Sequence, residues 1–126
     1  MDESTLAGRV ERYLGSDIAT FVHLTSRGWS HDAELRSELR RTSLRLAAAF
    51  ARADDDLNPD HQLDALDETS GLADELEALV VVAMRVGVAD APQVEELTRR
   101  LGHLRQLVQR RLSRNLAEMP DLDDET

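Results

Sequence analysis

Apolar residues recur three and four positions apart through most of this chain, and that spacing restricts the fold more than any other feature of the sequence. The clearest run lies between residues 32 and 53, at Leu35, Leu39, Thr42, Leu46, Ala49, Phe50 and Ala53. This is the pattern of a helix with one buried face. Aromatic residues make up only 3% of the chain, so the core must consist of Leu, Val and Ala, which favours closely packed helices over a sheet. We expect an all-α protein.

Three further segments show the same periodicity, and the links between them are short. We predict helices over residues 3–26, 32–53, 59–86 and 91–116, followed by an acidic, disordered tail over residues 117–126. Gly15 is expected to weaken the first helix, and the small side chains of LAAAF in the second predict a close crossing with a neighbour. Helices of matched length with short links form an up-down-up-down antiparallel four-helix bundle. Residues 1–116 are predicted to form this single domain.

The acidic stretch ADDDLNPDHQLD, residues 53–64, is either a cation-binding loop or the link between two helices. An EF-hand loop that begins at Asp54 needs a Gly at its sixth position and an acid at its twelfth. Those positions are Pro59 and Ala65. Asn58 before Pro59 is instead a helix start, because the Asn side chain accepts from free N–H groups and Pro lacks the N–H that would go unpaired. We interpret the stretch as a link.

Residue types that form common catalytic and metal sites are missing or wrongly spaced. The chain has no Cys, which removes thiolate catalysis, disulfides and Cys-based zinc sites. None of the four His follows a Glu by three positions, as a di-metal bundle requires, and there is no Gly-rich phosphate loop or G-x-S-x-G motif. We therefore predict no catalytic residue, no metal, no cofactor and no enzymatic activity.

The first residues, MDESTLAGRV, lack a basic flank before an apolar run. The longest apolar run, ALVVVAM, is too short to cross a bilayer. With the absence of Cys, these features predict a cytoplasmic protein that does not associate with membranes.

Charge is sorted along the chain, whose net charge is −10. Residues 54–98 carry thirteen acids and one Arg, whereas residues 99–116 carry six Arg and no acid. We expect the fourth helix to lie against the acidic third one, with its Arg side chains paired to Asp67, Asp74 or Glu75. The other basic band is on the second helix, where three- to five-residue spacings group Arg36, Arg40, Arg41 and Arg45. These four are candidate contacts for a partner or for nucleic-acid phosphates, although the net charge disfavours nucleic acid.

The third helix is apolar nearly all round in its second half, which indicates burial on more than one side and hence self-association. The predicted oligomer interface comprises Val81, Val82, Met84 and Glu77. Glu77 lies at the edge of the apolar stripe, where an unpaired carboxylate is costly. We expect it to meet an Arg of the second helix, Arg41, or to cross a subunit boundary.

Several segments resemble a known family. VHLTSRGW, LRSELRRTSLRLAAAFARA and SGLADELEALVVVAMRVGVADAPQVEELTRRLGHLRQLVQRRL are similar to the four-helix-bundle protein family, which includes the 23S rRNA intervening sequence proteins and the accessory variability determinant of diversity-generating retroelements. The resemblance covers about residues 20–112. It is best from Leu76 to Val108, and the family's LRR pattern appears at Leu39 to Arg41. The chain departs from it at Ala47, Ala49 and Arg52–Ala53.

The resemblance implies a homopentameric barrel without known catalytic chemistry. Its retroelement members bind a reverse transcriptase and nucleic acid through a basic surface. Our leading expectation is a non-enzymatic, self-assembling bundle that acts as an adaptor or scaffold for an unidentified protein partner. The alternative is a nucleic-acid-binding accessory protein of a reverse transcriptase.

Overall fold

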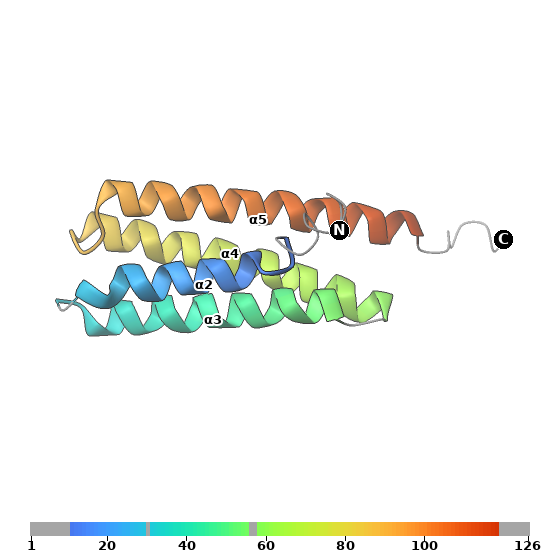
Figure 1. The fold of residues 1–126 in the computed structure, drawn as a ribbon, viewed down its shortest axis with the longest axis horizontal. Coiled ribbons are helices and arrows are strands. Elements are labelled where there is room, and N and C mark those ends of the chain that lie inside the picture. The colour runs from blue at the N-terminus through green and yellow to red at the C-terminus, as the bar shows by residue number, and fades with distance from the viewer. Residues whose placement is uncertain (1–10, 30, 56–57, 119–126) are drawn as a thin grey trace, which may run out of the picture.

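The computed structural model describes residues 11–29, 31–55 and 58–118 and contains only helices, turns and links in those ranges. The elements are α2 (Leu14–Thr25), the short 3-10 helix η1 (Ser26–Gly28), α3 (Ala33–Asp55), α4 (Pro59–Arg85) and α5 (Ala91–Glu118). Figure 1 shows the four α-helices side by side, with each running opposite to the one before it in the chain. The predicted all-α, up-down-up-down bundle is confirmed.

The helices pack in a closed cycle. α2 contacts α3 and α5, and α4 contacts α3 and α5. The core between them is made mainly of Leu, Ala and Val, and its largest fully buried side chains include Phe50, Ile18, Leu46, Leu76 and Leu104. α2 has 12 residues, whereas α3, α4 and α5 have 23, 27 and 28. The three long helices therefore continue past the start of α2 at one end of the bundle (Figure 1).

Local sequence signals account for most helix ends. The Asn58 side chain accepts a hydrogen bond from the Asp60 N–H at 2.9 Å, and Pro59 begins α4, as predicted. The acidic stretch is therefore the junction of two helices, with residues 53–55 in α3 and residues 59–64 in α4. Gly87 ends α4 with a φ of 80°, a conformation that suits Gly. At α5, the Asp90 carboxylate accepts from the Gln93 N–H at 2.9 Å while the Gln93 side chain accepts from the Asp90 N–H at 3.2 Å, which satisfies two N–H groups of the first turn.

The close crossing predicted from the small side chains of the second helix occurs between α2 and α3. A Cβ added to Gly15 would lie 3.2 Å from Phe50 Cβ and 3.3 Å from Ala47 Cα. Gly15 therefore lets the two backbones approach, which gives it a packing role beyond weakening a helix.

Two predicted boundaries are corrected. The first helix was expected to run unbroken over residues 3–26, but a turn at Tyr13 separates helical residues 11–12 from α2; its predicted part over residues 3–10 lies outside the described residues. The tail was expected to begin at residue 117, but α5 continues through Glu118, because nothing in its last turn stops a helix. The predicted disorder of residues 119–126 lies outside the described residues.

Candidate functional site

The four arginines of the predicted basic band do not act together. The Arg36 guanidinium donates to the Trp29 carbonyl at 3.1 Å. Arg40 donates to the Ser26 hydroxyl at 2.8 Å and to the His23 carbonyl at 3.2 Å. Carbonyls at the end of a helix lack partners within that helix, so these two arginines complete the end of α2 and η1. They are held by their own chain.

The other two arginines of the band point outward. The Arg41 guanidinium lies 3.1 Å from the Glu38 carboxylate, one turn away on α3, with 65% of its side chain exposed. Arg45 is exposed, and no ion pair links it to another described residue. Only this half of the predicted band is available to an outside partner.

The residues of the predicted oligomer interface do not share one surface. Val82 and Met84 are 47% and 41% exposed, whereas Val81 is only partly exposed. Because an α-helix turns by about 100° per residue, Val82 and Met84 point in nearly opposite directions, about 160° apart. Of these residues, Val82 lies on the outward face of α4 together with the exposed Ala78.

Glu77 has an Arg partner, but the partner differs from the predicted one. Arg105 of α5 places its guanidinium 2.5 Å from the Glu77 carboxylate and 2.8 Å from the Asp74 carboxylate. The expected contact with Arg41 is wrong, because Glu77 lies on the side of α4 that faces α5 and Arg41 pairs with Glu38. The contact across a subunit boundary stays a prediction. Burial lowers the pKa of Arg105, but its hydrogen bonds to Glu77 and Asp74 outweigh this and leave the pKa raised. The predicted pairing of the fourth helix with Asp74 is confirmed, while Asp67 and Glu75 have no such contact among the described residues.

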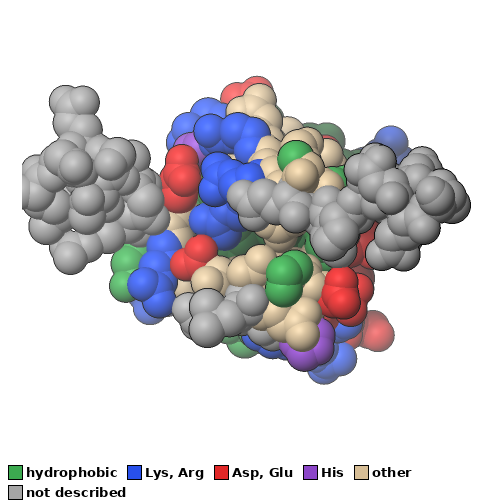
Figure 2. Space-filling view, turned by 90° about the vertical axis from the view of Figure 1, so that its right-hand side faces the viewer, with side chains coloured by type: hydrophobic (Ala, Val, Ile, Leu, Met, Phe, Trp, Pro, Cys, Tyr) green, Lys and Arg blue, Asp and Glu red, His purple; other side chains and the backbone are tan. Residues whose placement is uncertain are grey.

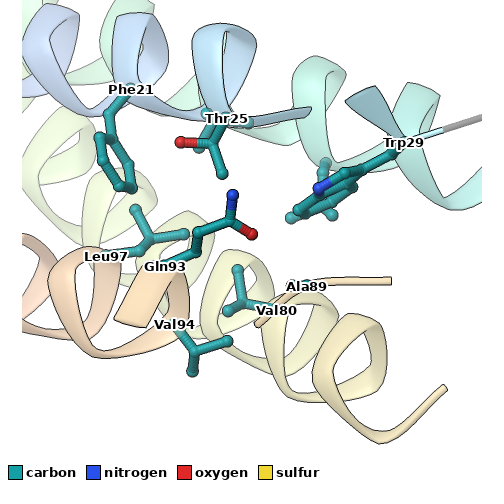
Figure 3. Close-up of a pocket in the computed structure, with 10 residues that line it drawn as sticks. Phe21, Thr25, Trp29, Val80, Ala89, Gln93, Val94 and Leu97 are labelled. Carbon is teal, nitrogen blue, oxygen red and sulfur yellow. The ribbon is translucent and has the colours of Figure 1, made fainter. Parts of the chain in front are cut away.

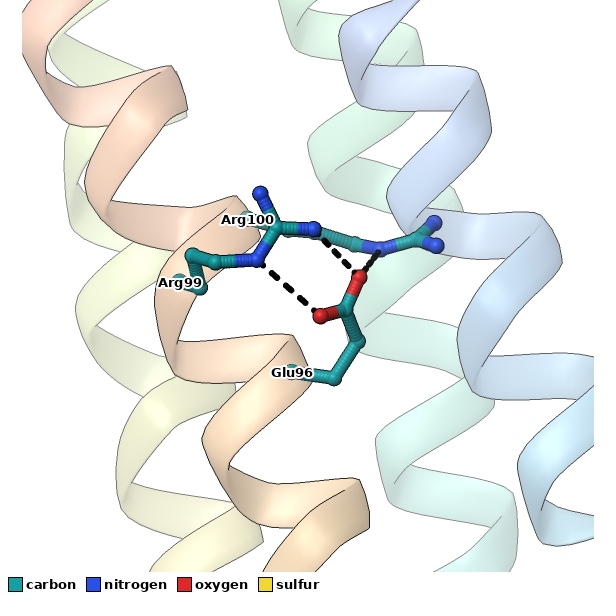
Figure 4. Close-up of polar contacts among 3 residues, drawn as sticks. All are labelled: Glu96, Arg99 and Arg100. Atoms are coloured by element: carbon teal, nitrogen blue, oxygen red, sulfur yellow. Dashed lines mark hydrogen bonds and ion pairs between the residues drawn. The ribbon is translucent and has the colours of Figure 1, made fainter.

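Further arginines of α5 are also engaged within the chain. Glu96 accepts hydrogen bonds from Arg99 at 2.6 Å and from Arg100 at 2.8 Å (Figure 4). These hydrogen bonds lower the pKa of Glu96 to about 2. The Arg100 guanidinium also lies 4.4 Å from the centre of the Phe21 ring on α2, within the range of a cation–π contact. The basic character of α5 therefore contributes to holding the bundle together.

An exposed apolar groove lies between α2 and α3, and sequence reasoning missed it. It has a volume of about 420 Å³ and is lined by Ser16, Ala19, Thr20, His23, Leu24, Arg27, Leu44 and Ala47. Leu24 and Leu44 are 53% and 55% exposed. One signal was present in the sequence, because Leu44 falls outside the buried stripe of its helix. That signal could not show that Leu24 of another helix lies beside the same groove. We call this surface the α2–α3 groove.

Three other hollows lie elsewhere on the bundle. One of about 440 Å³, slightly larger than the α2–α3 groove, is lined by Arg105, Gln106, Gln109 and Arg110 of α5. Near the α4–α5 turn, side chains including Phe21, Thr25, Trp29, Gln93 and Val94 surround a cavity of about 10 Å³ (Figure 3), which has room for about one water molecule. At the end of the bundle beyond α2, a polar cavity of about 190 Å³ is lined in part by Asp54, Arg111 and Arg114.

The charges at that polar end are largely paired with one another. Arg111 lies 3.3 Å from Asp54 and 4.9 Å from the centre of the Phe50 ring, and Arg12 lies 3.3 Å from the same carboxylate. Figure 2 looks onto this end and shows basic and acidic side chains next to each other. The cluster ties α5 to α3 where α2 no longer separates them.

Neither a metal site nor a membrane span is found in residues 11–29, 31–55 and 58–118. No group of three or more His, Asp or Glu side chains there is placed to hold a metal ion, and no helix there is both long and apolar enough to cross a bilayer. Comparison of the chain with models of known protein families, with curated proteins and with solved structures finds no match.

Proposed function

We propose that this chain is a non-enzymatic four-helix bundle that assembles with copies of itself and serves as an adaptor or scaffold for a protein partner. The α2–α3 groove carries the proposal. It is lined by two leucines, Leu24 and Leu44, that are each about half exposed. Leucines exposed together in a groove are typical of protein-binding surfaces.

The form of the groove fits a helix better than a small ligand. Small-molecule sites enclose most of their ligand and present a few convergent polar groups, whereas this groove is an open channel between two helices. A helix can insert an apolar stripe between α2 and α3 as helices do inside bundles. Fully burying a leucine side chain contributes about 1.5–3 kcal/mol, and Leu24 and Leu44 still have about half of that surface to bury.

The number of copies rests on the family resemblance, which supports five.

The nucleic-acid alternative has weaker support. Arg36 and Arg40 bind carbonyls of their own chain, and the net charge of −10 repels a polyanion at long range. Arg41 and Arg45 alone give little basis for a phosphate-binding strip.

The test is the mass of the purified protein in solution, measured by light scattering over a dilution series. We expect a mass near five times the chain mass of 14.1 kDa that persists on dilution. The variant Leu44→Asp should reduce this mass, because it places a charge in the groove. Leu116→Asp is the matched control, since Leu116 is 61% exposed on α5 and lies outside the groove. A wild-type protein that is monomeric at every concentration would refute the proposal.

A further inference from the structure

We propose that the α2–α3 groove binds the outward face of α4 from a second copy of the chain, so that copies associate head to tail. The inference rests on the proposed self-assembly and specifies which two surfaces meet. We define the α4 face as Asp64, Asp67, Gly71, Glu75, Ala78 and Val82. At about 100° per residue, all six point within about 80° of one another, and all six are exposed.

Gly71 is the first indication that another molecule approaches the α4 face. It lies in the middle of a 27-residue helix, and Gly is among the poorest helix formers. A Cβ added to Gly71 would meet nothing within 4 Å, so packing inside the chain does not require Gly at this position. By contrast, Gly15 is explained by its contact with α3. Close approach of an outside backbone would account for Gly71 in the same way.

The α4 face and the groove also match in shape. On α4, Gly71 and Ala78 are seven positions apart and form a stripe of small residues that continues to Val82. On α3, the groove includes Ala47 and the surface beside it continues through the exposed Ala48. Small side chains on both surfaces allow a short distance between helix axes, and Leu24 and Leu44 can then pack against the α4 stripe.

Charge supplies the third match. Asp64, Asp67 and Glu75 flank the small stripe of α4, and none of them has an ion pair among the described residues. Arg27 is the basic residue that lines the groove, and it is exposed. The acidic face of one copy can therefore meet Arg27 of the next, although two copies with net charge −10 repel each other overall.

The two surfaces are different, and this determines the kind of assembly. The groove is bounded by α2 and α3, while the α4 face lies on the other side of α3. One copy can therefore hold two neighbours at once. A head-to-tail contact of this kind forms a ring when the rotation closes, whereas a contact between identical patches stops at a dimer.

The experiment is a complementation test with two damaged variants. The groove variant is Leu44→Asp, and the face variant is Asp67→Arg with Glu75→Arg. Each changes exposed positions only, and far-UV circular dichroism should show the same helix content as the wild type. Leu44→Ser replaces the groove variant if Leu44→Asp lowers the helix content. The control for charge reversal is Glu34→Arg with Glu95→Arg, which changes two exposed acids of α3 and α5 by the same charge. Neither residue lines the groove or belongs to the α4 face.

We expect each damaged variant to have the mass of one chain, 14.1 kDa, and the control to assemble like the wild type. An equimolar mixture of the two damaged variants should give a species of two chains. In that species, the intact α4 face of the groove variant occupies the intact groove of the face variant, and growth stops because both remaining surfaces are damaged.

The other outcomes would overturn the inference. If the wild type assembles but the face variant does so as well, the occupant of the groove is not α4. If both variants are monomers and their mixture stays monomeric, the contact is not head to tail between these surfaces. A monomeric wild type would instead refute the proposed self-assembly itself, so the two failures can be told apart.

Discussion

The α4–α5 side and the α2–α3 side of the bundle differ in whether ion pairs join the two neighbouring helices. Between α4 and α5, Arg105 bridges Glu77 and Asp74. Between α2 and α3, no ion pair joins the two helices within their described residues, and Leu24 and Leu44 remain about half exposed. A side that is closed by charge pairs within the chain needs nothing more, whereas a side that leaves leucines exposed is suited to an outside helix.

The largest expected effect is on the free energy of unfolding, and it distinguishes two leucines of α3 that lie two positions apart. Leu46 is fully buried, with 0% exposure, and Leu44 is 55% exposed. Leu46→Ala should lower the free energy of unfolding by about 2–5 kcal/mol, because it leaves a cavity in the core. Leu44→Ala should lower it by less than about 0.5 kcal/mol in the monomer. Urea denaturation at a concentration where the protein is monomeric measures both. Equal losses would mean that Leu44 belongs to the chain's own core.

The next effect tests the close approach of α2 and α3. Gly15→Leu should destabilise the bundle by about 1–3 kcal/mol, because the new side chain overlaps Phe50 and Ala47. Gly71→Ala is the contrasting variant. It should stabilise the monomer by about 0.5–1 kcal/mol, since the site is open and Ala is the better helix former. Thermal or urea unfolding of both variants provides the measurement, and a Gly15→Leu variant as stable as wild type would contradict the packing described for α2.

A smaller loss of stability is expected when the ion pairs of Arg105 between α4 and α5 are removed. Arg105→Ala removes the partner of Glu77, which is only partly exposed, and should cost about 1–2 kcal/mol of unfolding free energy. Arg45→Ala serves as the control, because Arg45 is exposed, and its effect should stay within about 0.5 kcal/mol. If the two substitutions cost the same, the Arg105 bridge contributes no more than an ordinary surface charge.

The smallest effect concerns acid pH. Hydrogen bonds from Arg99 and Arg100 lower the pKa of Glu96 from its ordinary value of 4.5 to about 2 in the folded state. The folded protein therefore holds the proton less tightly than the unfolded chain does, so this interaction stabilises the fold above pH 4.5. The stabilisation is lost as the pH falls from about 4.5 to about 2.

Glu96→Gln should consequently weaken the dependence of stability on pH in that window and leave other parts of the pH profile unchanged. Urea denaturation at a series of pH values measures the difference between variant and wild type. Titration of the Glu96 carboxyl followed by NMR measures the pKa directly. A titration midpoint near 4.5 would show that the two arginines do not bind this carboxylate in solution.

Local chemistry in the sequence determined the helices and most of their ends. The Asn58–Pro59 pair starts α4, Gly87 ends it and Asp90 starts α5. Each of these signals acts through backbone groups within about four residues. For the same reason the start of α4 could be predicted within the acidic stretch over residues 53–64. The periodicity of the apolar residues then predicted the buried face of each helix and the class of fold.

Only the tertiary structure decided which helix each outward or edge residue meets. Glu77 pairs with Arg105 and not with Arg41. Arg40 binds the His23 carbonyl near the end of α2, and Leu24 and Leu44 line one groove. Apolar periodicity identifies the face of a helix that is buried, but it does not specify which neighbour lies to the left or right of that face or at what height. Those relations depend on how four helices pack together, so contacts between distant segments appear only when the chain is folded.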